Sequence, residues 1–200
     1  GFLIERGTKG LTVGAPIGKM GLRTSPMAEL FLEDCEVPVA NRLGREGQGS
    51  AIFNHSMGWE RSCILATSVG AMERQLETCI RYAKERRQFE RSIGSFQLIA
   101  SKIADMKIRL ETSRLLLYRA ASSQATGGMT ALDAAIAKLY ISESAVQSAL
   151  DAIQIHGGYG YTKEYQVERD LRDAIGGRLY SGTSEIQRLL IARNLGLPSD

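Results

Sequence analysis

Two charged residues at the start of a long helical region are the first candidates for chemistry in this sequence. Glu60 and Arg61 precede an apolar stripe that includes Leu65 and Val69, and Glu60 lies off that stripe. Residues on one helix face recur every three or four positions, so the Glu60 carboxylate can face a cleft while the stripe faces a core. Carboxylates in clefts serve as acids and bases. The alternative is an ordinary solvated helix charge.

The segment from Gly182 to Glu185 offers a different kind of chemistry. It opens the last helix that we expect, and the first N–H groups of a helix have no partner within it. Those near Gly182 could therefore polarise a carbonyl oxygen. Glu185 falls in the first turn, where an acidic side chain also caps the helix or stabilises its dipole.

The composition indicates a globular protein and gives no reason to propose a nucleic acid or a membrane as partner. Of the 200 residues, 44% are hydrophobic, and 25 Lys and Arg stand against 22 Asp and Glu, which gives a net charge of +3. The charges are interspersed, and no apolar run approaches the length of a membrane span.

The cysteines predict free thiols and no metal site. Cys35, Cys63 and Cys79 are an odd number without CxxC or Cys/His spacing. Free thiols are typical of a reducing compartment, so we expect a cytoplasmic location, or the mitochondrial matrix in a eukaryote. The chain begins at Gly1, inside an expected strand and without an initiator Met, so we expect it to be part of a larger protein.

The elements that must position these residues change in character near residue 45. Glycine and proline divide residues 1–44 into short runs such as Leu11-Thr12-Val13, which predicts short strands joined by turns. From Gly49 onward apolar residues recur at helical spacing, and the next proline is Pro198.

Five amphipathic helices are expected in this second region. Three long stripes run from Leu65 to Ala83, from Phe96 to Leu117, and from Leu132 to Ile153, and the last is interrupted at Glu143. Pairs of glycines end the second and third helices, and shorter helices follow near 163–175 and 182–195. Long amphipathic helices with short connections predict an antiparallel bundle.

Six short motifs occur in an order that resembles the C-terminal half of acyl-CoA dehydrogenases. They are Glu85-Arg86-Arg87-Gln88-Phe89, Phe96-Gln97, Ala104-Asp105-Met106, Gln154 to Tyr161, Glu168 to Ala174 and Gly182 to Gln187. Each motif alone is weak, but all six in this order are highly specific. Segments 19–23 and 41–44 also resemble the end of the family's middle β-domain, so the resemblance covers nearly the whole chain.

The resemblance implies a mainly α fold. Residues 45–200 would form the family's C-terminal helical bundle, which binds FAD and forms a homodimer or homotetramer, and residues 1–44 would end the middle β-domain. The implied activity is FAD-dependent α,β-dehydrogenation of an acyl thioester, by α-proton abstraction and β-hydride transfer to the flavin. An electron-transfer flavoprotein or a similar acceptor is the implied partner. The segment alone should lack a complete site.

The resemblance also locates the catalytic base. Many family members have a Glu immediately before the Gly-Thr that opens the last helix, and this chain has Ser181 there. A serine hydroxyl is too weak a base without an activating group. Isovaleryl- and long-chain-type members use a position on the first long helix of the bundle, which corresponds to Glu60. The resemblance therefore implies Glu60 as base, and Glu185 is the weaker alternative.

Further site residues follow from the same comparison. Arg61 would lie near the thioester or the pantetheine, although a surface ion pair would explain it equally well. Gly182 would polarise the thioester carbonyl, and Thr183 and Glu185 would contact the FAD.

Another set would reach the FAD of a neighbouring subunit. Arg86, Gln88 and Phe89 match the segment that contacts the pyrophosphate, and Gln154, Gly157 and Gly158 would approach the adenosine. Ordinary helix ends would also explain Arg86 and the two glycines. Glu90 stands where the family usually has a glycine, so this chain departs from the pattern at the local turn. His156 is expected to be a packed histidine.

Two alternatives to a CoA thioester enzyme remain open. One is the same desaturation on a thioester bound to a carrier protein in secondary metabolism. The other is a non-catalytic helical module that only assembles into oligomers. Flavin absorbance of the full-length protein separates the enzymes from the module.

Overall fold

The computed structural model describes residues 1–128 and 130–198, apart from the side chain of residue 62. It divides into two compact units, Gly1–Met57 and a second unit from Gly58 onward, which are described separately below. The expected boundary between a β-domain and a helical domain, after residue 44, stays a prediction.

The first unit contains little regular structure. Strand β1 (Leu11–Val13) pairs antiparallel with β2 (Leu30–Leu32), with Leu11 opposite Leu32. A short 3₁₀ helix, η1 (Val39–Asn41), follows, and α1 (Gly49–Cys63) begins in this unit and ends in the second.

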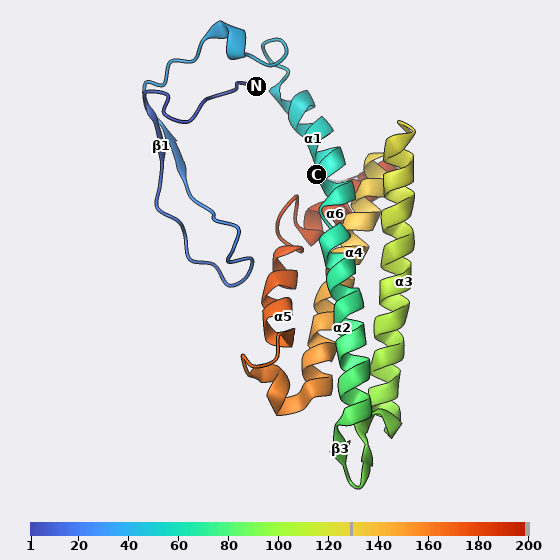
Figure 1. Cartoon of the computed structure of the whole chain (residues 1–200). Helices are drawn as coiled ribbons and strands as arrows, with labels where there is room; N and C mark the ends of the chain where they lie inside the picture. Colours follow the sequence, from blue (N-terminus) through green and yellow to red (C-terminus); the bar gives the residue numbers. More distant parts are fainter. Residues whose placement is uncertain (129, 199–200) are drawn as a thin grey trace. The chain divides into compact units, whose positions relative to one another are not determined.

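The second unit confirms the predicted mainly α fold. Its described residues form the further helices α2 (Ala66–Glu85), α3 (Gln97–Ala125), α4 (Ala131–His156), α5 (Val167–Gly176) and α6 (Ser184–Asn194). Helices α2, α3 and α4 lie side by side with alternating directions (Figure 1). Helix α4 contacts α2, α3, α5 and α6, and small buried residues such as Ala135, Ala149 and Ala152 let these neighbours approach it. The bundle core therefore centres on α4.

The expected first helix is divided in two, which corrects the prediction of five helices. Helix α1 ends at Cys63 and α2 begins at Ala66, after Leu65 with φ −85° and ψ 2°. Leu65 is fully buried, so its packing holds the chain at this bend. Glu60 and Arg61 therefore lie on α1, whereas the apolar stripe that was expected to continue from them belongs to α2.

A small hairpin between α2 and α3 was not predicted from the sequence. Strands β3 (Arg87–Gln88) and β4 (Arg91–Ser92) pair antiparallel, and Phe89 and Glu90 form the turn with φ of 51° and 65°. Two consecutive residues with positive φ are typical of the two-residue turns that suit the twist of a hairpin. A short 3₁₀ helix, η2 (Ile93–Ser95), connects β4 to α3.

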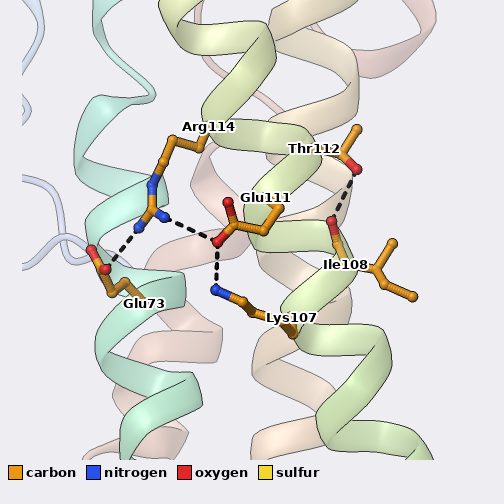
Figure 2. A network of polar contacts seen from close by, with 6 residues as sticks. All are labelled: Glu73, Lys107, Ile108, Glu111, Thr112 and Arg114. Carbon is orange, nitrogen blue, oxygen red and sulfur yellow. Dashed lines mark hydrogen bonds and ion pairs between the residues drawn. The ribbon is translucent and has the colours of Figure 1, made fainter.

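Polar contacts join α2 to α3 on the surface of the bundle. Figure 2 shows the Arg114 guanidinium between Glu111 of its own helix, at 3.0 Å, and Glu73 of α2, at 2.7 Å. Lys107 contacts the same Glu111 carboxylate at 2.5 Å, and its hydrogen bond holds the pKa of Glu111 below the usual value. These groups are partly or largely exposed, so the network is expected to add little to stability.

Candidate functional site

Glu60 meets the loop before α6. The Ser181 hydroxyl donates a hydrogen bond to Glu60 Oε1, and both residues are half-buried. Arg61 Nε donates to the carbonyl oxygen of Ser181 at 3.0 Å. The residue that the family comparison proposed as base thus contacts the position where many relatives carry theirs. We call Glu60, Arg61, Ser181, Gly182 and Gln187 the Glu60 cluster.

The loop in this cluster is held in an unusual backbone conformation. Ser181 has φ 56° and Gly182 has φ 93°, in the left-handed region that side chains other than glycine disfavour. The fully buried Gln187 donates from Nε2 to the carbonyl oxygens of Ser181, at 3.3 Å, and Gly182, at 3.0 Å. A Cβ on Gly182 would lie 2.6 Å from that Nε2. A side chain at position 182 would therefore be strained by the backbone and would displace the Gln187 amide.

The beginning of α6 is capped by its own residues. Thr183 Oγ1 accepts a hydrogen bond from the N–H of Ile186 at 3.4 Å. Hydrogen bonds to its own backbone N–H and to Thr183 lower the pKa of the exposed Glu185. Glu185 therefore has the contacts expected of a capping residue.

Glu143 explains the interruption of the apolar pattern in α4. Its Oε1 accepts hydrogen bonds from Ser184 Oγ at 2.6 Å and from Arg178 Nε at 3.0 Å. The Glu143 carboxylate of α4 thereby holds Ser184, the first residue of α6. It also helps to fix the position of the loop around Gly182, which directly precedes α6. The apolar pattern marked this position but indicated no partner for it.

Lys138 of α4 is fully buried. No acceptor among the described residues reaches its Nζ within hydrogen-bonding distance. Burial, and then the nearby positive charge of Arg61, lower the pKa of Lys138. This residue is therefore held as a poorly solvated amine behind the Glu60 cluster, and its place inside the helical repeat hid it from sequence analysis.

A separate pocket of about 450 Å³ lies at the other end of α2. It brings together Arg86 and Gln88 with Gly157 and Gly158, which follow α4 in the short helix η3 (Gly157–Tyr161). We call this the Arg86 pocket. The two other residues expected there, Phe89 and Gln154, are exposed and do not line it.

His156 forms one wall of the Arg86 pocket. Its ring stacks on Tyr82 with centroids 4.2 Å apart, and Nδ1 lies 2.8 Å from the carbonyl oxygen of Ala152, so Nδ1 carries the proton. Burial lowers the pKa of His156. Its buried Nε2 is thus an acceptor, and no donor among the described residues reaches it. The expected packed histidine also lines this pocket.

The open space beside the glycines suits a bound group. A Cβ on Gly157 or Gly158 would meet nothing within 4 Å. The Arg86 guanidinium lies 5.4 Å from the centre of the Tyr159 ring, a distance typical of a cation–π contact. The pocket therefore combines a fixed cation, an aromatic ring and accessible backbone, which suits a phosphate joined to a planar ring.

The two sites are far apart within one chain. Glu60 precedes α2 and Arg86 follows it, and a helix of 20 residues is about 30 Å long. The structure therefore separates the expected site residues into two groups. Within residues 1–128 and 130–198, no group of three or more His, Cys, Asp and Glu could hold a metal ion.

Cys79 is excluded as a nucleophile. Burial, and then the charge of Asp151, raise its pKa to about 12, and the reactive form of cysteine is the thiolate.

Among the described residues, no helix combines the length and apolarity needed to cross a bilayer.

Comparison with known proteins identifies the family to which this fold belongs. Residues 47–196 match the family model of the acyl-CoA dehydrogenase C-terminal domain. The chain belongs to the acyl-CoA dehydrogenase family. It spans about half the length of the curated relatives it matches.

Three solved structures are similar over nearly the whole chain. The prolyl acyl carrier protein oxidase AnaB is 57% identical, with a TM-score of 0.96 over 98% of this chain and 52% of its own. PigA with FAD and proline is 48% identical, with a TM-score of 0.95 over 98% and 51%. Butyryl-CoA dehydrogenase from Megasphaera elsdenii is 40% identical, with a TM-score of 0.94 over 97% and 51%.

Proposed function

We propose that the protein containing this chain oxidises an acyl thioester to its 2,3-enoyl form, with Glu60 as the base that removes the α-proton. The contact between Glu60 and Ser181 carries this proposal. It puts a carboxylate beside the position from which many family members act on the same substrate carbon. The lack of Glu at position 181 and its presence at position 60 thus compensate each other in space.

FAD is the cofactor in this proposal, and the Arg86 pocket supports it. Arg86 suits the pyrophosphate because a guanidinium forks onto two phosphate oxygens, and Gly157 and Gly158 leave room for the adenosine. His156 Nε2 is a buried acceptor without a described donor in the same wall. Bound FAD would supply the acceptor for the β-hydride and pass the electrons on to another protein.

The residues of this chain would orient the substrate and move one proton. Glu60 would take the α-proton onto its carboxylate while N–H groups near Gly182 hold the thioester oxygen. Arg61 already donates to Ser181 through Nε, so its remaining N–H groups are the ones that would contact the thioester or pantetheine. Thr183 and Glu185 would approach the FAD from the start of α6.

The distance between the two sites supports a homo-oligomer, either a dimer or a tetramer. Since about 30 Å of α2 separates them, the Arg86 pocket would bind the FAD of a neighbouring subunit. Large apolar side chains of α3 are exposed, among them Leu98 at 82% and Leu115 at 70%, as expected of a surface that another copy covers. A cytoplasmic location and an electron-transfer flavoprotein or similar acceptor complete the proposal.

A thioester on a carrier protein is a second candidate substrate. Two of the similar structures named above, AnaB and PigA, concern prolyl or proline chemistry, and they are 57% and 48% identical to this chain, against 40% for butyryl-CoA dehydrogenase. The ring of a prolyl group would need the same α-proton removal, so Glu60 would keep its role. The two candidates differ in what holds the thioester.

Anaerobic bleaching of the flavin by acyl thioesters tests the proposal in the full-length protein. We expect acyl thioesters to bleach the flavin of the unsubstituted protein. In Glu60→Gln the rate of bleaching should fall about 10²- to 10⁴-fold while flavin stays bound. Glu77→Gln, at an exposed glutamate of α2 outside both sites, is the matched control and should bleach like the unsubstituted protein. Equal rates in the parent and Glu60→Gln would remove Glu60 from the mechanism, and absence of bound flavin in the parent would favour the assembly module.

The same assay separates the two substrates. Free CoA thioesters and the same acyl or prolyl groups on a carrier protein are compared at equal concentration. Bleaching by the free thioesters supports the CoA enzyme. Bleaching only by carrier-bound groups establishes the second candidate.

A further inference from the structure

We infer that Ser181 is a positioning residue that orients the Glu60 carboxylate for proton removal. The inference deepens the proposed function and rests on it. The Ser181 hydroxyl donates to Oε1 of Glu60. Among the described residues, no donor reaches Oε2. One carboxylate oxygen is thus occupied and the other is left to accept the α-proton.

The loop holds Ser181 at both its backbone and its side chain. Its carbonyl oxygen accepts from Arg61 Nε at 3.0 Å and from Gln187 Nε2 at 3.3 Å. The hydroxyl is then directed at Glu60 from a backbone with φ 56°. A residue other than glycine persists in this conformation only where its surroundings impose it, and such residues cluster at functional sites.

A hydroxyl suits this position better than a second carboxylate would. Position 181 is within hydrogen-bonding distance of Glu60, where two carboxylates would repel and one would take up a proton. A hydroxyl instead donates to the ionised form. Serine at 181 is therefore the partner of a base at 60 rather than a vestige of a lost base.

Two substitutions separate the hydroxyl from the backbone conformation. Ser181→Ala removes Oγ and keeps a side chain in the left-handed region, whereas Ser181→Gly removes Oγ and also relieves that conformation. If the hydroxyl orients the base, both variants should bleach the flavin about 10-fold more slowly at saturating thioester. The thioester concentration at half-maximal rate and the flavin content should stay unchanged.

An isotope effect and a double variant give readouts that a purely structural role would not change. With α-deuterated thioester, the isotope effect on bleaching should rise in Ser181→Ala and Ser181→Gly because proton removal has become slower than other steps. In a Glu60→Asp background, where the shorter carboxylate no longer reaches the hydroxyl, Ser181→Ala should cause less than about a twofold further loss.

If both serine variants bleached the flavin at the rate of the unsubstituted protein, the inference would be overturned. It would also be overturned if only Ser181→Gly kept that rate, because the loss in Ser181→Ala would then come from the backbone conformation. Full further loss in the Glu60→Asp background would overturn it too, since Ser181 would then act independently of Glu60. The proposed function fails by a different result, unchanged bleaching in Glu60→Gln. The two failures are therefore distinguishable within one assay.

Discussion

The two ends of α2 are built on opposite principles. In the Glu60 cluster, Gln187 and Arg61 fix the loop carbonyls, the Ser181 hydroxyl is directed at Glu60, and a side chain on Gly182 would displace the Gln187 amide. In the Arg86 pocket, the glycines face open space and a buried histidine nitrogen has no described donor. The loop of the first arrangement is held by side chains of the chain itself, although Gln187 Oε1 has no donor among the described residues, whereas the second arrangement leaves open space beside its glycines. The proposed proton transfer needs fixed geometry, whereas the proposed cofactor binding needs accessible surface.

The largest effect expected from this contrast is on a matched pair of glycines. Gly182→Ala should lower the free energy of unfolding by about 2 kcal/mol or more, because the left-handed φ disfavours a side chain and the new Cβ displaces Gln187. Gly158→Ala, in open space, should change it by less than about 0.5 kcal/mol. Denaturant titration of both variants checks this, and similar losses in the two would erase the contrast.

Lys138→Met should raise the free energy of unfolding by about 1 kcal/mol at pH 7. The substitution removes a buried amine that has no hydrogen-bond acceptor among the described residues, and methionine conserves most of the side-chain volume. Burial lowers the folded-state pKa of Lys138 below 10.5, so the unfolded chain binds the proton first as the pH falls below 10.5, and stability declines there. Denaturant titrations of the variant should lack this decline. A less stable variant would show that Lys138 has a partner in the full-length protein.

Glu90→Gly tests the hairpin beside the Arg86 pocket. Glu90 has φ 65°, which glycine adopts without steric cost, and its carbonyl oxygen, which accepts from Arg87, is kept by any residue at this position. The gain is partly offset by the greater freedom of glycine in the unfolded chain, so we expect an increase in stability of about 0.5 kcal/mol. Thermal unfolding measures it, with Glu90→Ala as the control that keeps the strain.

The smallest effect is a pH dependence that originates in the Arg86 pocket. Burial depresses the folded-state pKa of His156 below 6.5, so the unfolded chain gains its proton first as the pH falls through 6.5, and the folded state loses stability. His156→Gln should flatten the decline in Tm as the pH falls below 6.5. An unchanged slope would show that other groups cause it.

Much of the fold follows from the sequence because the apolar stripes are long. The helical period and the glycine pairs predicted α3 and α4, and the long amphipathic stripes with short connections predicted the bundle. The division between α1 and α2 was missed because Ile64 and Leu65 continue the apolar pattern, and neither glycine nor proline marks the bend. The hairpin was missed because Phe89-Glu90 lacks the usual turn residues. Tertiary packing decides both.

For the candidate site, the sequence indicated individual residues, whose roles stay predictions, but not how those residues are arranged. Ser181, where many relatives carry a glutamate, and the presence of Glu60 together indicated compensation, but residues 121 positions apart carry no sign of a hydrogen bond between them. Gln187 and Lys138 were missed because each stands within a helical repeat as an ordinary polar residue. Their roles depend on full burial, which only the assembled bundle provides.

The central place of α4 has a consequence for how the molecule is made. Helices α2 and α3 are synthesised before α4, which ends at His156. Both of them pack against α4. Until α4 has left the ribosome, the apolar faces that will pack on it are uncovered, and they are open to chaperones and to aggregation. Once the bundle closes, the amides of α4 should be the last in this unit to exchange with deuterium, since they open only when the whole unit unfolds.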